Sequence, residues 1–207
     1  MPENASQDDL RLSELIILAA LWMLFGFMLW YYLSAFHGIP VRLIADEILG
    51  SLLGSQYTGI IPNPDHHYLF LVQTQIPFLF PDGSREALGF IINPVIFGFG
   101  LPLLFGLVLA SGVSLARKFG TLLVGYVCVM LIQVWGVVWQ ALKMLAFNFG
   151  PDAHQLTIDA GISDEVIALC YQLGVLIFPP LVPIILWVLA NWKLIEQFTG
   201  WQKQSDS

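Results

Sequence analysis

Charged residues are scarce in this chain of 207 residues. They make up 11% of the sequence, whereas hydrophobic residues make up 57%; soluble domains usually carry roughly a quarter charged residues. Eight Lys and Arg and fifteen Asp and Glu cannot cover so apolar a chain with a solvated surface. This scarcity excludes a soluble single-domain enzyme and a disordered chain, and it predicts an integral membrane protein.

Basic patches, paired cysteines and catalytic motifs are missing as well. The net charge is −7, and Arg117 and Lys118 are the only adjacent cations, so we expect no nucleic-acid partner. Cys128 and Cys170 stand apart in apolar stretches without a CxxC pair, as packing residues do, and we therefore expect no metal and no cofactor. The sequence also contains no HExxH, GxSxG or P-loop motif.

The chain does contain several long apolar runs. A spanning helix needs roughly 20 mostly apolar residues. We therefore predict an all-α membrane protein forming a single integral membrane domain over residues 1–207, with four transmembrane helices and an outer segment. The predicted spans are residues 15–36, 91–111, 119–142 and 166–190.

The first span could instead be a cleaved signal peptide. Its apolar run is longer than the roughly 7–15 residues of a signal-peptide core, and the tail before it carries four acidic residues against one cation, Arg11. No small-residue cleavage site follows it. We therefore interpret it as an uncleaved span.

The few cations predict the orientation of the spans. Arg117 and Lys118 lie in the loop between the second and third spans, and Lys193 and Lys203 follow the fourth, whereas the loop 148–165 has four acidic residues and no cation. Because Lys and Arg in short loops favour the cytoplasmic side, we predict that both termini are cytoplasmic. The segment 37–90 and the loop 148–165 then face outward.

The outer segment 37–90 has its own pattern. Residues 39–53 read as a short amphipathic helix lying on the membrane interface, with Ile44, Ile48 and Leu52 on its apolar side and with Arg42, Asp46 and Glu47 facing water. Runs 56–61 and 67–80 flank the turn-forming residues 62–65, and residues 81–84 mark another turn. We expect a small β element here. The tails 1–9 and 202–207 are predicted to be disordered.

The third span carries polar residues along one helical face. Gln133, Gly136, Gln140 and Lys143 occupy positions i, i+3, i+7 and i+10. The simpler interpretation is helix–helix packing, with hydrogen bonds between helices and a lysine that reaches the headgroups. The alternative is a polar groove for a peptide or a lipid headgroup.

The other candidate partner or structural residues lie in the second and fourth spans. Interrupted helices can form binding sites in transporters, but no second matching half is present, so a small carrier is a minor alternative. Prolines within the fourth span predict a kink or break. Tyr171, the first aromatic residue of that span, fits a belt of aromatic residues at the membrane interface. These candidates are Asn93, Pro94, Gly98, Gly100, Pro102, Tyr171, Gln172 and Pro179.

A thiol enzyme is the catalytic alternative. Cys170 lies near the outer interface and His154 lies in the adjoining outer loop. A thiol nucleophile needs a histidine that activates it, and this pair could supply both groups. The two residues have no characteristic spacing, and we predict no catalytic residue.

The second half of the chain resembles the exosortase H-associated membrane proteins, a family of small multi-pass bacterial proteins. The resemblance is carried by INPVIFGFGLPLLFGLVLA (92–110), QVWGVVWQALKMLAF (133–147) and ALCYQLGVLIFPPLVPIILWVLANWKLIE (168–196). It implies a non-enzymatic accessory protein of the bacterial inner membrane, found with an exosortase that processes proteins bearing C-terminal sorting signals. The implied partners are the lipid bilayer, the exosortase and its substrate helix.

Overall fold

The computed structural model describes residues 12–79, 83–192 and 196. The predicted disordered tails 1–9 and 202–207 lie outside the described residues, and so do Lys193 and Lys203, on which the predicted orientation partly depends. Pro81 and Asp82 of the second predicted turn also lie outside them.

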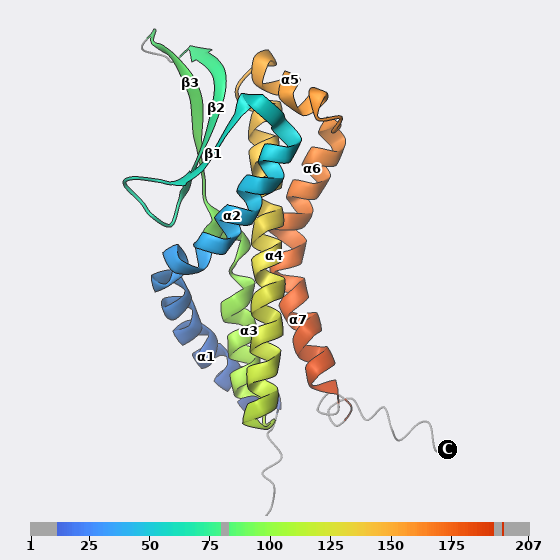
Figure 1. The fold of residues 1–207 in the computed structure, drawn as a ribbon. Coiled ribbons are helices and arrows are strands. Elements are labelled where there is room, and N and C mark those ends of the chain that lie inside the picture. Colours follow the sequence, from blue (N-terminus) through green and yellow to red (C-terminus); the bar gives the residue numbers. More distant parts are fainter. Residues whose placement is uncertain (1–11, 80–82, 193–195, 197–207) are drawn as a thin grey trace, which may run out of the picture.

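Seven α-helices and a three-stranded sheet are arranged along the described chain as Figure 1 shows. The helices are α1 (Leu12–Tyr32), α2 (Ser34–Leu53), α3 (Gly100–Ala110), α4 (Leu115–Phe147), α5 (Pro151–Asp159), α6 (Asp164–Gln172) and α7 (Phe178–Ala190). The strands are β1 (Tyr57–Pro62), β2 (Phe70–Leu79) and β3 (Arg85–Ile92). Short 3₁₀ turns form η1 (Gly54–Gln56) and η2 (Pro94–Phe97), and a π-helical turn forms η3 (Leu173–Ile177).

Three helices are long and apolar enough to cross a membrane: Ser13–Tyr32, Leu115–Phe147 and Asp164–Ala190. They correspond to the first, third and fourth predicted spans. The third of these helices runs through α6, η3 and α7, so the interruption predicted at its prolines takes the form of a π-helical turn directly before Phe178 and Pro179.

The predicted span 91–111 is not a single helix, and the expected count of four spans is not confirmed. β3 extends to Ile92, and Asn93 and Pro94 then turn the chain into η2 before α3 begins. The reason is local, because a residue before proline is pushed toward an extended conformation. The 11 residues of α3 extend about 16 Å, against a hydrocarbon thickness of about 30 Å.

α2 is longer than predicted and buries a different face. It begins at Ser34, directly after α1, and it packs against β1 and α4 with a face that includes Val41, Ala45 and Leu49. Ile44 and Ile48, of the predicted apolar side, are exposed, and their contact with the membrane interface stays a prediction. Both rows have helical spacing, so the position of the sheet and α4 decides which one is buried.

The polar face predicted for α2 is partly wrong. Glu47 is exposed as expected, but Arg42 and Asp46 bind the sheet. Arg42 Nη1 donates to the carbonyl oxygen of Ile60 at 2.9 Å, and Asp46 Oδ1 accepts hydrogen bonds from the Tyr57 hydroxyl at 2.6 Å and the Ile60 amide at 2.8 Å. Burial and then the Asp46 carboxylate raise the pKa of Tyr57 above its ordinary value, so this hydroxyl keeps the proton it donates.

The sheet confirms the predicted β element and adds a strand. β2 lies between β1 and β3 and pairs antiparallel with both. The sequence pattern does not predict a strand over residues 85–92, and it places the last two of them in a span. Alternate residues of β2 and β3, such as Val72 and Phe90, enter the same core as α2 and the C-terminal half of α4.

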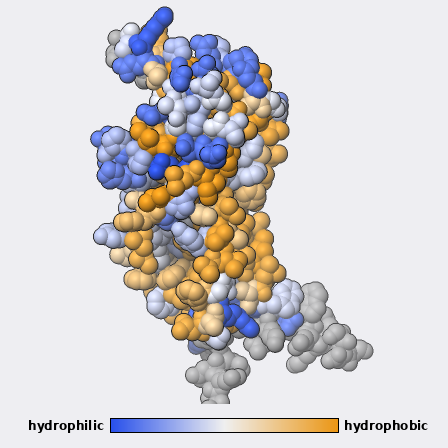
Figure 2. Space-filling view, in the orientation of Figure 1, coloured by the Kyte–Doolittle hydropathy of each residue, from blue (hydrophilic) through white to orange (hydrophobic). Residues whose placement is uncertain are grey.

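The molecule has an apolar end and a polar end. The 33 residues of α4 extend about 50 Å, which exceeds the bilayer's apolar thickness. Figure 1 shows the first turn of α1, the α3–α4 connection and the end of α7 at one end of the molecule, and the sheet and α5 at the other. In Figure 2 hydrophobic side chains cover the helical part, and hydrophilic ones gather over the sheet and α5.

Candidate functional site at the junction of α1, α2, η2 and α4

Two interruptions of regular secondary structure lie near the middle of α4. One is the turn at Leu33 between α1 and α2, and the other is the segment Asn93–Phe97 that carries β3 into η2. The Asn93 Oδ1 accepts a hydrogen bond from the Val95 amide at 3.0 Å and so caps the start of η2. Pro94 follows as the first residue of η2, where its missing N–H costs nothing.

Gln133 joins η2 to α4. Its side chain is 2% exposed, and its Nε2 donates to the carbonyl oxygen of Pro94 at 3.1 Å. A buried amide is stable only when it is paired, and this bond pairs the Gln133 amide with the main chain of η2. The Gln133 side chain thus joins α4 to another element, while its role toward a partner stays a prediction.

Gly98 and Gly136 allow these elements to approach each other. A Cβ at Gly136 would collide with the ring of Phe97, and a Cβ at Gly98 would collide with the Gln133 amide. The same Cβ at Gly98 would also lie 3.2 Å from the Trp30 ring. The two glycines therefore hold η2 between α1 and α4.

Trp30 and His37 complete the junction. Their rings stack with centroids 6.0 Å apart at 29°. Among the described residues, neither Trp30 Nε1 nor His37 Nε2 has a hydrogen-bond partner, although both atoms are buried. Burial lowers the pKa of His37, and hydrogen bonds with its own backbone and with the Gln133 side chain oppose that shift only in part. His37 is therefore neutral at neutral pH.

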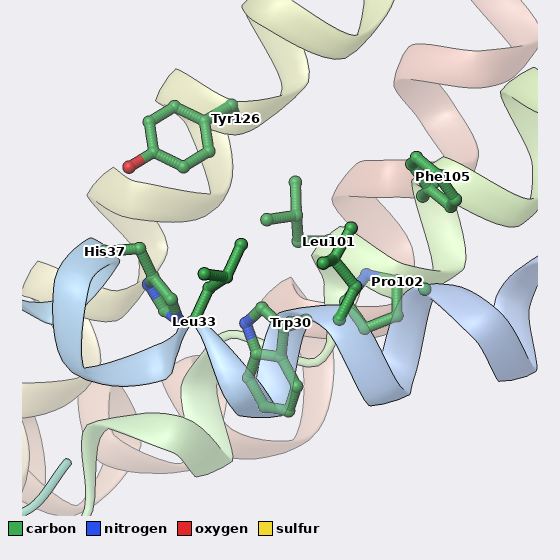
Figure 3. Close-up of a pocket in the computed structure, with 9 residues that line it drawn as sticks. Trp30, Leu33, His37, Leu101, Pro102, Phe105 and Tyr126 are labelled. Atoms are coloured by element: carbon green, nitrogen blue, oxygen red, sulfur yellow. The ribbon is translucent and has the colours of Figure 1, made fainter.

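A cavity of about 140 Å³ lies beside this pair. Figure 3 shows side chains from α1 and α2, from α3 and from α4 around one space, with the nitrogen edge of Trp30 turned toward Leu33 and His37. Its lining consists of Gly26, Leu29, Trp30, Leu33, His37, Leu101, Pro102, Phe105 and Tyr126.

The remaining predicted residues of the second and fourth spans pack α3 against α7. Gly100 lies against the carbonyl of Pro179 and the ring of Pro183, where a Cβ would clash. Pro102 is buried and lines the cavity. These contacts give the glycines and prolines of both segments a packing role.

The polar face predicted on α4 divides into two parts. Gln133 and Gly136 contact η2, whereas Lys143 lies nearer the polar end, with its Nζ 5.0 Å from the centre of the Tyr171 ring. This is a cation–π contact between α4 and α6. Gln140 Oε1 is buried without a hydrogen-bond partner among the described residues, and Gln172 is exposed.

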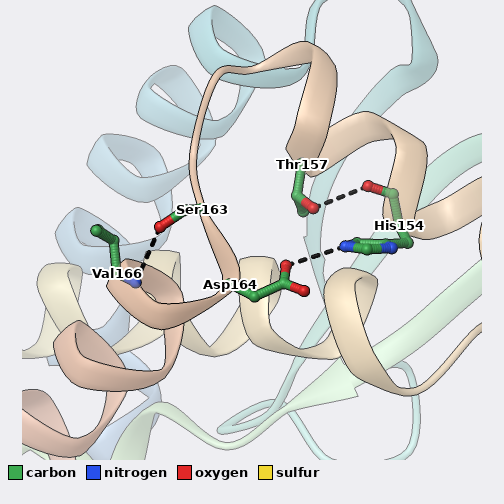
Figure 4. Close-up of polar contacts among 5 residues, drawn as sticks. All are labelled: His154, Thr157, Ser163, Asp164 and Val166. Carbon is green, nitrogen blue, oxygen red and sulfur yellow. Dashed lines mark hydrogen bonds and ion pairs between the residues drawn. The ribbon is translucent and has the colours of Figure 1, made fainter.

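The histidine of the alternative thiol pair contacts an aspartate. His154 Nε2 lies 2.9 Å from Asp164 Oδ1 at the start of α6, as Figure 4 shows. Asp164 precedes Cys170 by six residues, which is about 9 Å along a helix axis. Thr157 Oγ1 donates to the His154 carbonyl at 2.8 Å within α5, and Ser163 caps α6. The His154–Asp164 contact joins the two helices. Within the described residues, no three His, Cys, Asp or Glu side chains form a group that could hold a metal ion.

Trp30 and His37 are the site residues that the sequence predictions missed. By sequence, Trp30 is an interfacial aromatic residue, and His37 is the first residue after a span. Their separation of seven residues, two helical turns, is the available signal, but the break at Leu33 hides it.

Comparison with known proteins identifies the family. The family model described as exosortase H-associated membrane protein matches residues 9–194. No curated protein and no solved structure matches the chain. The family match includes α1, the sheet, the junction at Gln133 and α7, and therefore reaches beyond the half of the chain that carries the resemblance. The chain belongs to the family of exosortase H-associated membrane proteins.

Proposed function

We propose that this chain is a non-enzymatic accessory protein of the bacterial inner membrane that assists an exosortase in sorting surface proteins with C-terminal signals. The family match is the observation that carries this proposal. In this role the protein holds a client chain beside the exosortase or stabilises the exosortase itself.

The geometry supports a scaffold for such contacts. The C-terminal half of α4 shares one core with α2 and the sheet, so the outer segment is fixed on the apolar helices. In the order β1-β2-β3, Arg42 and Asp46 of α2 occupy the main chain of β1 at Ile60, whereas the outer edge of β3 has no partner strand among the described residues. Such edges can pair with an extended peptide. A partner held there would be in a defined position relative to the spans.

A deletion strain scored for surface-protein processing tests the proposal. We expect processing to fail without the gene and to return with the wild-type chain, and the tagged chain to recover the exosortase in mild detergent. Normal processing in the deletion strain, together with recovery of no exosortase, would contradict the proposal.

Two complementing variants separate the roles within that strain. Cys170→Ala removes the thiol, and we expect it to restore processing; failure at a normal protein level would favour a thiol enzyme. Gln133→Leu removes the bond to Pro94. If it lowers processing while protein level and thermal stability stay unchanged, a polar groove is favoured over simple packing.

A further inference from the structure

The sheet has one protected edge and one open edge. On β1, side chains of α2 bind both the carbonyl and the amide of Ile60. β3 forms the opposite edge of the sheet, as Figure 1 shows. Proteins usually protect such an edge with charged residues or proline, but residues 87–92 of β3 contain neither. The chain therefore covers one edge and leaves the other accessible.

The main-chain groups on the open edge can be assigned from one side-chain contact. Thr74 Oγ1 on β2 donates to the carbonyl oxygen of Leu88 at 2.9 Å, so the main chain of Leu88 faces β2. Successive residues of a strand present their N–H and C=O groups to opposite edges. Those of Ala87, Gly89 and Ile91 therefore face outward. All three residues are exposed, and no hydrogen bond from outside the sheet reaches them within the part of the chain that the structure describes.

The outer face beside this edge is small and uncharged. An open hollow of about 390 Å³ lies there, lined by residues of all three strands. Ala87 and Gly89 form its β3 side, and Gln73 and Gln75 supply amide groups from β2. Because Ala87 and Gly89 have little or no side chain, a side chain of an added strand can lie across them and reach these amides. The lining contains no charged residue, so an uncharged polar side chain fits it.

The direction of β3 excludes a second copy of this chain as the added strand. Figure 1 shows β3 running along the length of the molecule, from the polar end toward the apolar helices. Two copies with the same sidedness in one membrane are related by a rotation about the membrane normal, so their β3 strands would be parallel, with each outward N–H opposite the same N–H. Antiparallel pairing of two identical edges needs an axis perpendicular to the strands, which would turn one copy upside down in the bilayer. The edge therefore suits a different chain.

We propose that the outer edge of β3 binds an extended segment of the client protein, which adds to the sheet as a further strand through the main chain of Ala87, Gly89 and Ile91. An uncharged polar side chain of the client occupies the hollow beside Gly89. This inference rests on the proposed function, because the client is the chain that is held beside the exosortase. The eight residues of β3 extend about 26 Å and align the client along the line from the sheet to the membrane.

Complementation of the deletion strain with two variants of Gly89 tests this edge. Gly89→Pro removes an outward N–H, and an edge strand tolerates proline where its N–H faces solvent. Gly89→Ala keeps the N–H, and its added Cβ would make ordinary contacts of 3.6 Å with Leu71 and 3.7 Å with Val72. We expect Gly89→Pro to lower client processing by about fivefold or more, the factor of one typical hydrogen bond. Gly89→Ala should process the client as the wild type does.

The deletion strain also separates this inference from the proposed function. Normal processing without the gene refutes the proposed function and the inference with it. Processing that is lost without the gene and fully restored by Gly89→Pro refutes only the addition of a client strand to β3.

Disulfide scanning keeps the test decisive even if Gly89→Pro does not fold. Cys128 and Cys170 are replaced by Ala, and Ala87→Cys is combined with single cysteines at successive positions of the surface protein whose processing fails in the deletion strain. Isolated membranes are then oxidised with copper phenanthroline. We expect crosslinks at every second client position, because side chains of a strand alternate between its faces. Ile61→Cys, on the protected β1 edge and 39% exposed in the wild type, is the matched control and should give none.

Three results of the scan would overturn the proposal. Crosslinks that repeat every three to four client residues would show a helix and not a strand. Crosslinks from Ala87→Cys to a second copy of the chain would show a dimer at this edge. Absence of any crosslink to the client would show that β3 does not bind it.

Discussion

Gly136 lies in close contact with Phe97 of η2. A Cβ at Gly174 would lie 3.5 Å from the Gly136 Cα, so one glycine of α4 faces two neighbouring elements. Close-packed interiors do not absorb an added methyl group there without shifting the Phe97 ring.

We expect Gly136→Ala to lower the free energy of unfolding by about 1–3 kcal/mol through overpacking. Gly120→Ala on the same helix is the control, because a Cβ added there would meet no other element within 4 Å and alanine favours a helix over glycine by about 1 kcal/mol. Thermal unfolding in detergent measures both. Equal behaviour of the two variants would refute the close contact at Gly136.

A second prediction at this scale concerns His37 and pH. Above its ordinary pKa of 6.5, the side chain is neutral in both the folded and unfolded states. As the pH falls below 6.5, the unfolded chain takes up a proton first, because burial lowers the folded pKa. The free energy of unfolding therefore decreases with falling pH, by at most about 1.4 kcal/mol per pH unit, until the folded pKa is passed.

Denaturation between pH 8 and pH 5 checks this sign. His37→Gln should flatten the loss of stability on acidification, whereas His67→Gln, in an exposed loop position, should leave the wild-type slope. A wild-type slope in His37→Gln would show that His37 does not contribute to the acid sensitivity.

At the scale of elements, α2 holds the first strand of the sheet through side chains. Asp46 and Arg42 bind the main chain of β1 at Ile60 on both its N–H and its C=O. These two hydrogen bonds use the N–H and the C=O of Ile60 on an edge strand, and they fix that strand against α2.

We expect Asp46→Ala to destabilise β1 by about 1–3 kcal/mol, because it leaves the Ile60 amide without its acceptor. Hydrogen exchange of the segment 57–62 should become faster, while exchange in α4 should not change. Glu47→Ala, at the exposed neighbouring position, is the matched control. If the segment 57–62 exchanges as slowly in Asp46→Ala as in the wild type, the hydrogen bond from Ile60 to Asp46 does not stabilise β1.

At the scale of the whole molecule, the α3–α4 connection and the sheet lie at opposite ends. Residues 111–114 lie at the apolar helices' far end from the sheet, close to Lys118, whose Nζ donates to the Leu109 carbonyl at 2.8 Å. We propose that this end is cytoplasmic and that the sheet and α5 face outward.

Labelling with a membrane-impermeant maleimide tests the sidedness in a chain whose Cys128 and Cys170 are replaced by Ala. Glu86→Cys, at an exposed position of β3, should react in spheroplasts with an intact inner membrane, whereas Ser114→Cys should react only after that membrane is opened. The reverse pattern would invert the proposed topology.

The candidate site shows how far a sequence pattern reaches. Spacing places Gln133 and Gly136 on one face of a helix, and the structure shows this face in contact with other elements. Spacing could not show that the same face divides, with Lys143 against Tyr171. It also could not pair Trp30 with His37, since helical periodicity ends at a break in the helix.

The sequence by itself determined that the chain belongs in a membrane and where its long helices run, because both depend on the local density of apolar residues. It also located the first two strands, through alternation and turn residues. Only the tertiary structure decided which stripe of α2 is buried, that residues 91–92 extend a strand, and which polar groups share the junction beside α4. Those outcomes depend on contacts between residues far apart in the chain, and such contacts leave no periodic signal in either segment alone.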